Sequence, residues 1–409
     1  MVAKSKNTAK RRRHGAGTTT PGDIHAAGAA PEPKAARKRA TKSRIRRLAM
    51  LTGGGDCPGL NAVIRAVAKT CIHKYGVACY GIEEGYHGLI YRRARVLRME
   101  DVSGILTLGG TILGSSNKDN PFSHTMTLDG KEQTVDLSAE CVNYIKQMGW
   151  DCLVAIGGDG TLAMADQFAK MGVPVIGVPK TIDNDLSATD YTFGFHTAVQ
   201  TATEAIDKLH TTAMSHHRVM IVEMMGRYTG HLALEAGVAG GGDIILIPEI
   251  PYDIEAVCRE VVRRSRAGKR FSIVVVAEGA KPIGGEMTVA KMVKDSPDPV
   301  RLGGIAHVLA DQISRKTHLE ARATVLGHLQ RGGTPTAVDR VLSTKFGYHA
   351  AELAVRGKFG RMVALQGHDV VDVPLEKAVA EIKKVPVNHP LIAAARAVGT
   401  CFGEPEEKC

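Results

Sequence analysis

The chain lacks the features that mark membrane-spanning and exported proteins. Its 409 residues contain no run approaching the roughly 18 uncharged apolar residues that a membrane helix needs. The first residues are basic and polar without an apolar core, so we expect no secretory signal. The eight cysteines form no CxxC pair and no zinc-binding spacing. We therefore expect reduced thiols and a cytoplasmic location.

Several common signatures of phosphate chemistry are also missing. The sequence contains no GxxxxGKS or GxxxxGKT loop, which excludes a P-loop. The motif set of protein kinases is absent as well, and no short-period repeat indicates a solenoid. A phosphotransferase with this sequence must use another scaffold.

The excess of positive charge is confined to the N-terminal segment. The net charge is +11, but residues 1–47 hold fourteen Lys and Arg against two acids, about +12, which leaves about −1 elsewhere. Because this composition cannot build a core, we predict that residues 1–45 form a basic disordered tail. Contact of the tail with nucleic acid or an acidic partner is the alternative, and a transit peptide fits only loosely.

From residue 46 onward, short apolar runs alternate with helical patterns. Apolar runs without polar alternation are typical of parallel strands that are covered on both faces. Strands are predicted at 48–52, 77–82, 153–156, 173–178, 218–224, 244–247, 273–277, 324–326 and 362–366, and helices at 60–75, 162–171, 198–209 and 254–266. The pattern predicts an α/β protein with two doubly wound, Rossmann-like lobes and an active-site cleft between them.

Glycine-rich loops follow two of the predicted strands. Gly53–Asp56 precedes a helix, where bare backbone amides bind phosphate well. Gly157–Thr161 repeats this arrangement and adds Asp159, a carboxylate that can hold Mg²⁺. Each loop is also explained as a tight turn, with Asp159 as a helix cap.

The segment Pro179–Asp185 is the richest in chemistry. Asp183 and Asp185 are two residues apart, so on an extended segment their side chains point the same way. One carboxylate can take a proton from an attacking hydroxyl while the other helps to place a metal, and Thr181 can donate to a transferring phosphoryl group. The alternative is a surface turn rich in Asp and Asn.

Cationic side chains gather at the ends of later strands. They are Arg218, Arg227, Arg322, His328 and Arg331. Because arginine pairs phosphate bidentately, the group favours a phosphate pocket, although any one of them alone is explained by a surface ion pair. Glu278, after the strand at 273–277, can accept hydrogen bonds from sugar hydroxyls.

In this order, the segments resemble the 6-phosphofructokinase family from about Leu48 to the C-terminal region. The matching motifs are Gly54–Asn61, Gly109–Ser115, Gly157–Thr161, Thr181–Asp185, Met225–Tyr228, Ala277–Glu278 and Gly327–Gly333. Gly157–Thr161 alone is not specific, because NAD kinases and diacylglycerol kinases resemble it there. The resemblance implies that a phosphoryl group of ATP is transferred, with Mg²⁺, to the 1-hydroxyl of fructose 6-phosphate in glycolysis.

The resemblance also implies a role for each matching residue. Asp183 would be the general base, Arg227 would stabilise the phosphoryl charge, and Thr181 and Asp185 would assist them. The residues implied for ATP are Gly54, Tyr86, Gly158, Asp159, Gly160, Thr161 and Lys180, with Asp159 also holding Mg²⁺. Those implied for fructose 6-phosphate are Thr181, Asp183, Met225, Gly226, Arg227, Glu278, His328 and Arg331, with Arg218 and Arg322 supplied by a neighbouring subunit.

The implied organisation is a homodimer or homotetramer of two-lobed subunits that act on small molecules without a membrane. The donor lobe would span residues 46–195 and part of 332–385. The sugar-phosphate lobe would span 196–331 and 386–409. A non-catalytic regulatory homologue and a nucleic-acid binder are the alternatives from other functional classes.

Three positions depart from common family members. Lys180 replaces the glycine of many ATP-using members and resembles the pyrophosphate-using ones. Those also carry an acid where this chain has Gly160, which leaves room for the α-phosphate of a nucleotide. The pair indicates the ATP-using branch related to the pyrophosphate-dependent group, with the pyrophosphate-dependent enzyme as the alternative. Asn117 replaces a bridging arginine, whose role would pass to Lys118 or Lys180.

Overall fold

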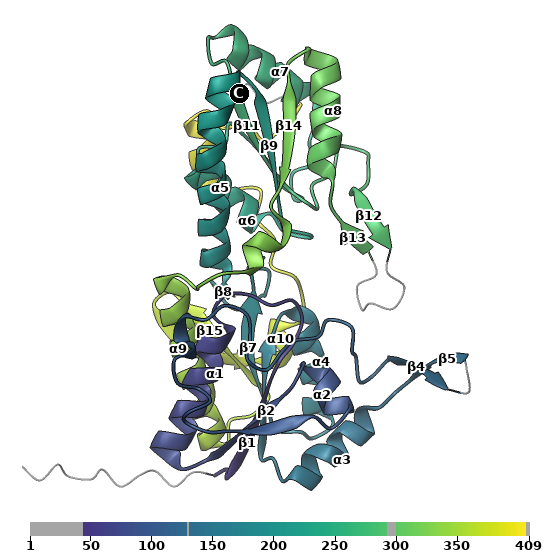
Figure 1. The fold of residues 1–409 in the computed structure, drawn as a ribbon, viewed down its shortest axis with the longest axis vertical. Helices are drawn as coiled ribbons and strands as arrows, with labels where there is room; N and C mark the ends of the chain where they lie inside the picture. Colours follow the sequence, from purple (N-terminus) through teal and green to yellow (C-terminus); the bar gives the residue numbers. More distant parts are fainter. Residues whose placement is uncertain (1–43, 129–130, 293–299, 406–409) are drawn as a thin grey trace, which may run out of the picture. The chain divides into compact units, whose positions relative to one another are not determined.

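The chain folds around two open sheets. The computed structural model describes residues 44–128, 131–292 and 300–405 (Figure 1). The larger sheet has the strand order β16-β15-β7-β6-β1-β2-β3, with β8 paired to β7. Its strands are β1 (Arg47–Thr52), β2 (Ala78–Ile82), β3 (Ala94–Leu97), β6 (Cys152–Gly157), β7 (Val175–Thr181), β8 (Phe193–Gly194), β15 (Arg361–Gln366) and β16 (Asp369–Pro374). All pairs are parallel except β2–β3 and β15–β16 at the edges.

The second sheet is smaller and wholly parallel. Its strand order is β10-β11-β9-β14. The strands are β9 (Val219–Met224), β10 (Ile244–Leu246), β11 (Ser272–Ala277) and β14 (Ala321–Val325). We call the larger sheet with its helices the first lobe, and the smaller sheet with its helices the second lobe.

The central strands are buried on both faces because successive side chains point to opposite sides. In β1, Leu48 and Met50 enter one core, while Ala49 and Leu51 enter the other. The first core is covered by α1 (Leu60–Lys69) and α9 (Ala337–Arg356). The second is covered by α2 (Tyr86–Ile90), α3 (Ser138–Met148), α4 (Asp159–Lys170) and α10 (Leu375–Ala378).

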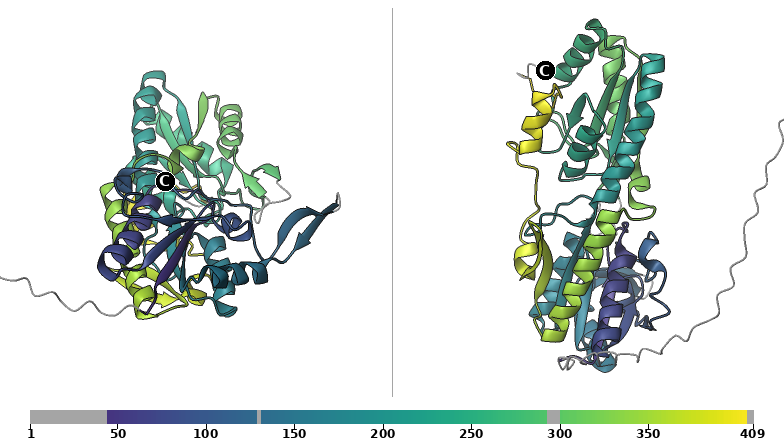
Figure 2. Two further views of the ribbon diagram at one scale, coloured as in Figure 1. Left: turned by 60° about the horizontal axis from the view of Figure 1, so that its bottom comes forward. Right: turned by 90° about the vertical axis from the view of Figure 1, so that its left-hand side faces the viewer.

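The second sheet is enclosed in the same way (Figure 2). One of its faces packs against α5 (Phe195–His216), α6 (His231–Ala239) and α11 (Pro390–Ala397). The other packs against α7 (Ile254–Arg266) and α8 (Ile305–Thr317). The segment after α9 therefore first adds β15 and β16 to the first lobe and then returns to the second lobe with α11.

Two hairpins lie outside the main sheets. One pairs β4 (His124–Leu128) with β5 (Lys131–Val135), and the other pairs β12 (Val289–Met292) with β13 (Val300–Leu302). Figure 1 shows both as arms beside the sheets. The sequence patterns did not predict either hairpin, because their residues show no apolar run that stands out from a loop.

The predicted α/β architecture is confirmed, but several element ends differ. Helix α4 begins at Asp159 rather than at residue 162, and β7 continues through Thr181. Helix α1 ends at Lys69 and continues as a π-helical turn, Thr70–Lys74, while short 3₁₀ segments occupy Ile105–Thr107 and Gly327–Arg331. Tertiary packing sets these ends, so α4 begins earlier and β7 ends later than predicted, whereas α1 ends earlier.

The cysteines and the tail complete the comparison with expectation. Six cysteines are buried and free, as predicted for reduced thiols. The prediction is wrong for Cys401, which is disulfide-bonded, and Cys409 lies outside the described residues. Most of the predicted tail, residues 1–43, lies outside them too. Among the described residues, no helix is long and apolar enough to cross a membrane.

Candidate active site

A polar cavity of about 840 Å³ lies where the carboxyl ends of strands from both lobes meet. Loops after β1, β6 and β7 reach it from the first lobe, and loops after β9, β11 and β14 reach it from the second. Parallel α/β sheets place their ligands at this edge. The cavity brings together every predicted site residue except Tyr86, Arg218, Gly226 and Arg322.

Close packing of two glycine loops shapes the first-lobe wall. Thr161, on the first turn of α4, is buried against Gly53 and Gly157. A Cβ atom on Gly53 would lie 2.6 Å from the Thr161 Oγ1 atom, and one on Gly157 would collide with the same side chain. Glycine at both positions therefore lets the loops after β1 and β6 approach each other beside the N-terminus of α4.

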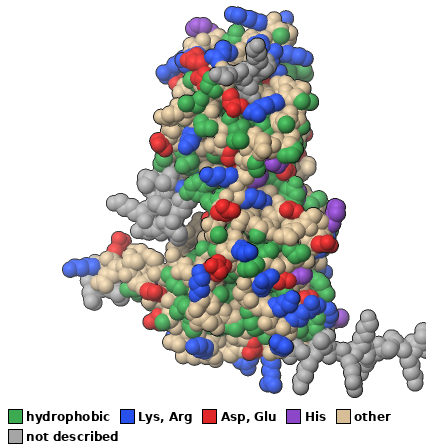
Figure 3. All heavy atoms as spheres, turned by 180° about the vertical axis from the view of Figure 1, so that it is seen from behind, with side chains coloured by type: hydrophobic (Ala, Val, Ile, Leu, Met, Phe, Trp, Pro, Cys, Tyr) green, Lys and Arg blue, Asp and Glu red, His purple; other side chains and the backbone are tan. Residues whose placement is uncertain are grey.

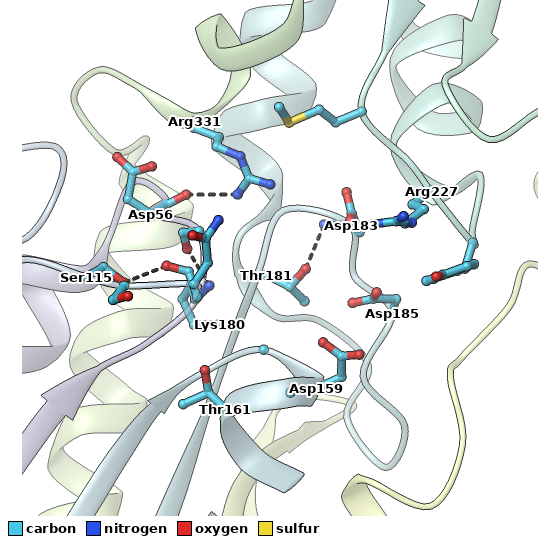
Figure 4. Close-up of a pocket in the computed structure, with 18 of the residues that line it drawn as sticks. Asp56, Ser115, Asp159, Thr161, Lys180, Thr181, Asp183, Asp185, Arg227 and Arg331 are labelled. Carbon is cyan, nitrogen blue, oxygen red and sulfur yellow. Dashed lines mark hydrogen bonds between the residues drawn. The ribbon is translucent and has the colours of Figure 1, made fainter. Parts of the chain in front are cut away.

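Three side chains donate hydrogen bonds to the carbonyl groups of the first glycine loop. The buried ammonium of Lys180 donates to the Gly55 carbonyl at 2.5 Å. Ser115 Oγ donates to the Gly54 carbonyl at 2.5 Å, and Arg331 Nη1 donates to the Asp56 carbonyl at 3.2 Å (Figure 4). Burial lowers the pKa of Lys180. Because its carbonyls are engaged, the loop is fixed at the edge of the cavity.

Three of the six carboxyl groups that line the cavity belong to predicted catalytic or metal-binding residues. Asp183 and Asp185 follow β7, and Asp159 lies on the first turn of α4 (Figure 4). The extended conformation expected around Asp183 is wrong: the backbone bends there, and Asn184 has a left-handed φ of 53°. The bend still turns the flanking carboxylates to the same side, so the shared direction was predicted correctly for a different reason.

The predicted base stands out among these groups. The Asp183 Oδ1 atom is buried, and no donor among the described residues hydrogen-bonds to it. Arg227 reaches toward Asp183 from the second lobe (Figure 4). Burial raises the pKa of Asp183 to about 6, with Glu278 and Asp159 adding to the shift. A carboxylate with this pKa is ionised at neutral pH and basic enough to accept a proton.

The pKa of Asp185 is raised further than that of Asp183. Burial first, and then the charges of Asp183 and Asp159, raise its pKa to about 7. Carboxylates that share a cavity resist simultaneous ionisation unless a cation joins them. The cavity is therefore suited to a positively charged ligand beside Asp185 and Asp159.

Short loops at the strand ends place the second-lobe side chains. Gln330 Oε1 accepts from the backbone amide of Met225 at 2.9 Å. The Glu278 amide donates to the Met224 carbonyl at 2.8 Å. Burial raises the pKa of the Glu278 carboxyl, and Glu223 adds to the shift. Met225, Arg227, Glu278, His328 and Arg331 all line the cavity.

Two predicted site residues lie directly behind the cavity wall. Tyr86 is buried, and its hydroxyl donates to the Thr161 carbonyl at 2.9 Å, so it supports the first turn of α4. Gly226 has a φ of 140°, and a Cβ there would lie 2.8 Å from the Thr229 carbonyl oxygen. This glycine shapes the turn that presents Met225 and Arg227.

Arg218 and Arg322 lie at the opposite ends of their strands from the cavity. Arg218 precedes β9, while Arg322 is the second residue of the neighbouring strand β14. Both contact Glu320: Arg218 Nε lies 2.9 Å from its Oε2 atom, and Arg322 pairs with the other oxygen. The cavity of the same chain does not include either arginine.

Sequence reasoning missed three residues that line the cavity: Asp119, Met164 and Leu302. Met164 lies one helical turn after Gly160, a spacing that would have indicated it. Asp119 accepts from Ser116 Oγ at 2.5 Å, so it fixes the loop that contains Asn117. Leu302 comes from β13, for which the sequence carried no signal.

Comparison with known proteins shows the family to which the chain belongs. Residues 47–354 match the family model described as phosphofructokinase. An ATP-dependent 6-phosphofructokinase 2 from Clostridium perfringens is 54% identical over 88% of this chain and 99% of its own length. A pyrophosphate–fructose 6-phosphate 1-phosphotransferase from Amycolatopsis mediterranei is 52% identical over 84% of this chain and 97% of its own.

A solved structure supports the same assignment. Phosphofructokinase from Saccharomyces cerevisiae superposes with a TM-score of 0.68 at 30% identity. The match covers 82% of this chain and 45% of the yeast chain. On the family model, the sequence identities and the shared fold, this chain is a member of the phosphofructokinase family.

Proposed function

We propose that this protein transfers the γ-phosphoryl group of ATP to the 1-hydroxyl of fructose 6-phosphate, in the glycolytic reaction of the cytoplasm. The observation that carries the proposal is that Asp183 and Arg227 line one cavity from different lobes, with Arg227 reaching toward Asp183 (Figure 4). A buried carboxylate oxygen without a donor can accept a proton, and a guanidinium beside it can neutralise developing phosphoryl charge. Phosphoryl transfer needs this positioning and charge more than covalent help.

In this proposal the two lobes hold different reactants. The glycine loops and Gly158–Thr161 at the N-terminus of α4 bind the donor phosphates through backbone amides. On the other side, Arg331 and His328 hold fructose 6-phosphate, and Glu278 accepts from its hydroxyls. Asp183 then takes the proton of the 1-hydroxyl as that oxygen attacks the γ-phosphorus. The bond from this phosphorus to the β–γ bridging oxygen breaks and ADP leaves, while Thr181 donates to the phosphoryl group in transit.

The carboxylates fit a magnesium ion. Among the described residues, no group of three or more His, Cys, Asp or Glu side chains is arranged to hold a metal by itself. Mg²⁺ commonly binds through one or two carboxylates together with substrate phosphates, and Asp159 and Asp185 offer that donor set. A bound Mg²⁺ would neutralise phosphate charge, and it would relieve the raised pKa of Asp185.

Open space beside Gly160 supports ATP as the donor. A Cβ atom on Gly160 would meet no heavy atom within 4 Å, so the protein itself leaves room there for a nucleotide phosphate. Lys180 is the observation that favours the alternative, pyrophosphate. Its ammonium is bound to the Gly55 carbonyl at the donor side, where it can also offset the missing arginine at Asn117.

The positions of Arg218 and Arg322 favour a shared site in a homodimer or homotetramer. These arginines lie outside the cavity of their own chain, and both pair with the single carboxylate of Glu320, which leaves one positive charge in excess. Val325, at the end of β14, and Leu329, in the 3₁₀ segment that follows, are exposed by 44% and 69%. An exposed apolar surface beside cations suits contact with a second copy whose sugar-phosphate site the arginines complete.

The remaining predictions on organisation are retained as proposals. The donor lobe is taken as 46–195 with part of 332–385, and the sugar-phosphate lobe as 196–331 with 386–409. On the face drawn in Figure 3, positive and negative side chains are interspersed. Contact of the basic tail with nucleic acid stays the less favoured alternative. A purely regulatory role is disfavoured because the side chains for both reactants meet in one cavity.

The test is the initial rate with each donor. Purified protein is assayed with saturating fructose 6-phosphate and Mg²⁺, with ATP in one series and pyrophosphate in the other, and fructose 1,6-bisphosphate is measured. We expect kcat/KM to be at least tenfold higher with ATP. A preference for pyrophosphate would contradict the choice of donor, and inactivity with both would contradict the reaction.

A further inference from the structure

The third connection between the lobes along the chain lies behind the catalytic carboxylates. Between α10 and α11, the chain crosses from the first lobe to the second. In this crossing, residues 382–385 lie against the loop that follows β7 and carries the predicted base, residues 182–192, which we call the catalytic loop. Ile382 forms an antiparallel bridge with Leu186 in that loop. The crossing therefore runs beside the catalytic loop and pairs with it through this single β-bridge.

Lys383 is the centre of this contact. Its backbone amide donates to the Asp185 carbonyl at 2.8 Å. Its ammonium donates to the carbonyls of Thr189 and Asp190, each at 2.9 Å, and to Asn184 Oδ1 at 3.1 Å. All three donor hydrogens are thus directed at acceptors within the catalytic loop. One side chain ties both ends of the loop together.

Asn184 transmits this contact to the predicted base. Its side chain is buried behind the cavity wall, while those of its neighbours Asp183 and Asp185 line the cavity. Besides the bond from Lys383, Asn184 Oδ1 accepts from the Thr192 amide at 3.1 Å. Because the backbone of Asn184 is left-handed, its side chain lies behind the cavity wall while the side chains of Asp183 and Asp185 line the cavity. Anchoring its amide group therefore fixes how the adjacent carboxylates point.

The charge of Lys383 is balanced by the groups around it. Burial lowers the pKa of Lys383 to about 8, and Asp185, Asp190 and Glu235 act in the opposite direction. The ammonium therefore stays largely protonated at neutral pH and keeps its three donors. Lys383 does not line the cavity, so it acts on the reactants only through the catalytic loop.

The same crossing is tied to the loop that carries Arg227. The Val385 amide donates to Glu249 Oε1 at 2.9 Å. The Gly230 amide donates to both oxygens of that carboxylate at 3.0 Å. Gly230 ends the turn that begins at Arg227 and opens α6. Glu249 therefore holds the Arg227 turn and the crossing in one position.

A direct hydrogen bond also joins the Arg227 turn to the catalytic loop. Thr229 Oγ1, in the Arg227 turn, donates to the Asp183 carbonyl at 3.3 Å. The catalytic loop and the Arg227 turn are thus joined directly through Thr229, and indirectly through Lys383 and Glu249. These bonds hold two loops from different lobes in a fixed relation, although Thr229, Lys383 and Glu249 do not line the cavity.

We propose that Lys383 is a positioning residue for the reaction: by binding the catalytic loop to the crossing between the lobes, it sets the direction of Asp183 relative to Arg227. The inference rests on the proposed function. Misplacement of a reacting group by about 1 Å can cost about a hundredfold in rate. Because no predicted contact to the sugar phosphate involves Lys383, the loss falls on kcat and leaves KM nearly unchanged.

The first experiment compares Lys383→Met with Lys384→Met in the full-length protein. Lys384 is the exposed neighbour, so its replacement removes the same charge without touching the catalytic loop. We expect kcat to fall by about 10- to 100-fold in Lys383→Met, with KM for fructose 6-phosphate within about threefold of wild type. Lys384→Met should keep the wild-type kcat. Equal kcat values for the two variants would overturn the proposal.

A double-mutant cycle with Asp183→Asn separates positioning from damage to the fold. Once the base is removed, its direction no longer matters, so Lys383→Met should cost less than about threefold in the Asp183→Asn background. An equal loss in both backgrounds would mark Lys383 as structural only. If Lys383→Met does not fold, Lys383→Arg decides: a planar guanidinium cannot reproduce the three bonds, so wild-type kcat in that variant contradicts the proposal.

The same assays distinguish this inference from the function on which it rests. A wild-type protein that transfers no phosphoryl group from either donor would overturn both. An active wild-type protein whose Lys383 variants behave like Lys384→Met would overturn only the role of Lys383.

Discussion

The two sides of the cavity are built by different means. On the first-lobe side, backbone from two glycine loops forms part of the wall, and these loops approach each other closely because Gly53 and Gly157 leave room for Thr161. On the second-lobe side, charged side chains stand at strand ends on loops that buried groups such as Gln330 hold in place. Backbone amides are common to all residues, so the selectivity of the glycine loops for a phosphate donor depends on which side chains are missing there. On the second side, it depends on which are present.

The largest effect is expected where the two sides meet. Asp183→Asn keeps the shape of the side chain but removes the basic oxygen, so kcat should fall by about 10³-fold or more while binding of fructose 6-phosphate persists. Steady-state rates and calorimetric titration with the sugar phosphate measure the two properties. A nearly normal kcat would exclude Asp183 as the base.

The donor side is tested by adding a carboxylate at Gly160. Gly160→Asp should lower kcat/KM for ATP by about 100-fold, because the new carboxylate enters the open space and repels the nucleotide phosphate. Any activity with pyrophosphate should fall far less. Gly160→Ala is the matched control and should spare ATP use, since its Cβ meets nothing within 4 Å. Equal losses with both donors in the Asp variant would refute the argument.

The acceptor side is tested by removing what another subunit is proposed to supply. Arg322→Ala should raise KM for fructose 6-phosphate by about tenfold or more, as expected for loss of a charged hydrogen bond. Arg315→Ala, an exposed arginine on α8 paired with Asp311, is the control and should leave KM unchanged.

Mixed oligomers sharpen this test. An Arg322→Ala subunit keeps an intact cavity, and an Asp183→Asn subunit can lend it Arg322. Denaturing and refolding the two variants together should therefore restore sites with wild-type KM. If mixing gives only the sum of the separate activities, the arginine does not act across subunits.

The smallest effect concerns stability. Burial raises the pKa of Asp183 to about 6, above its ordinary value of 3.8. The folded protein therefore binds a proton that the unfolded chain has released, and the stability present below about pH 4 is lost as pH rises through about 6. Without ligands at pH 8, Asp183→Asn should melt about 2–4 °C above wild type. The difference should disappear near pH 4, and a lower Tm at pH 8 would contradict this account.

Predictability from sequence differed between parts of the site. Residues next to apolar strands, such as Thr181 and Asp183 after β7, were located because the motif and the strand end coincide. Leu302 could not be found, because it reaches the cavity from a hairpin that carries no periodic signal. The shared direction of Asp183 and Asp185 was predicted from an extended chain, whereas a bend at Asn184 produces it.

What the sequence determined by itself was the alternation of strands and helices, the confinement of the excess positive charge to residues 1–47, and the motifs that mark the family. These properties depend on residues close together in the chain, so local pattern suffices. Only the tertiary structure decided which groups share the cavity, how burial raises the pKa of Asp183, and that Lys383 lies behind it. Lys383 is 200 residues from Asp183, and no local pattern connects them. Contacts over such separations arise when sheets and helices bury their apolar faces, and that packing places the polar groups between them.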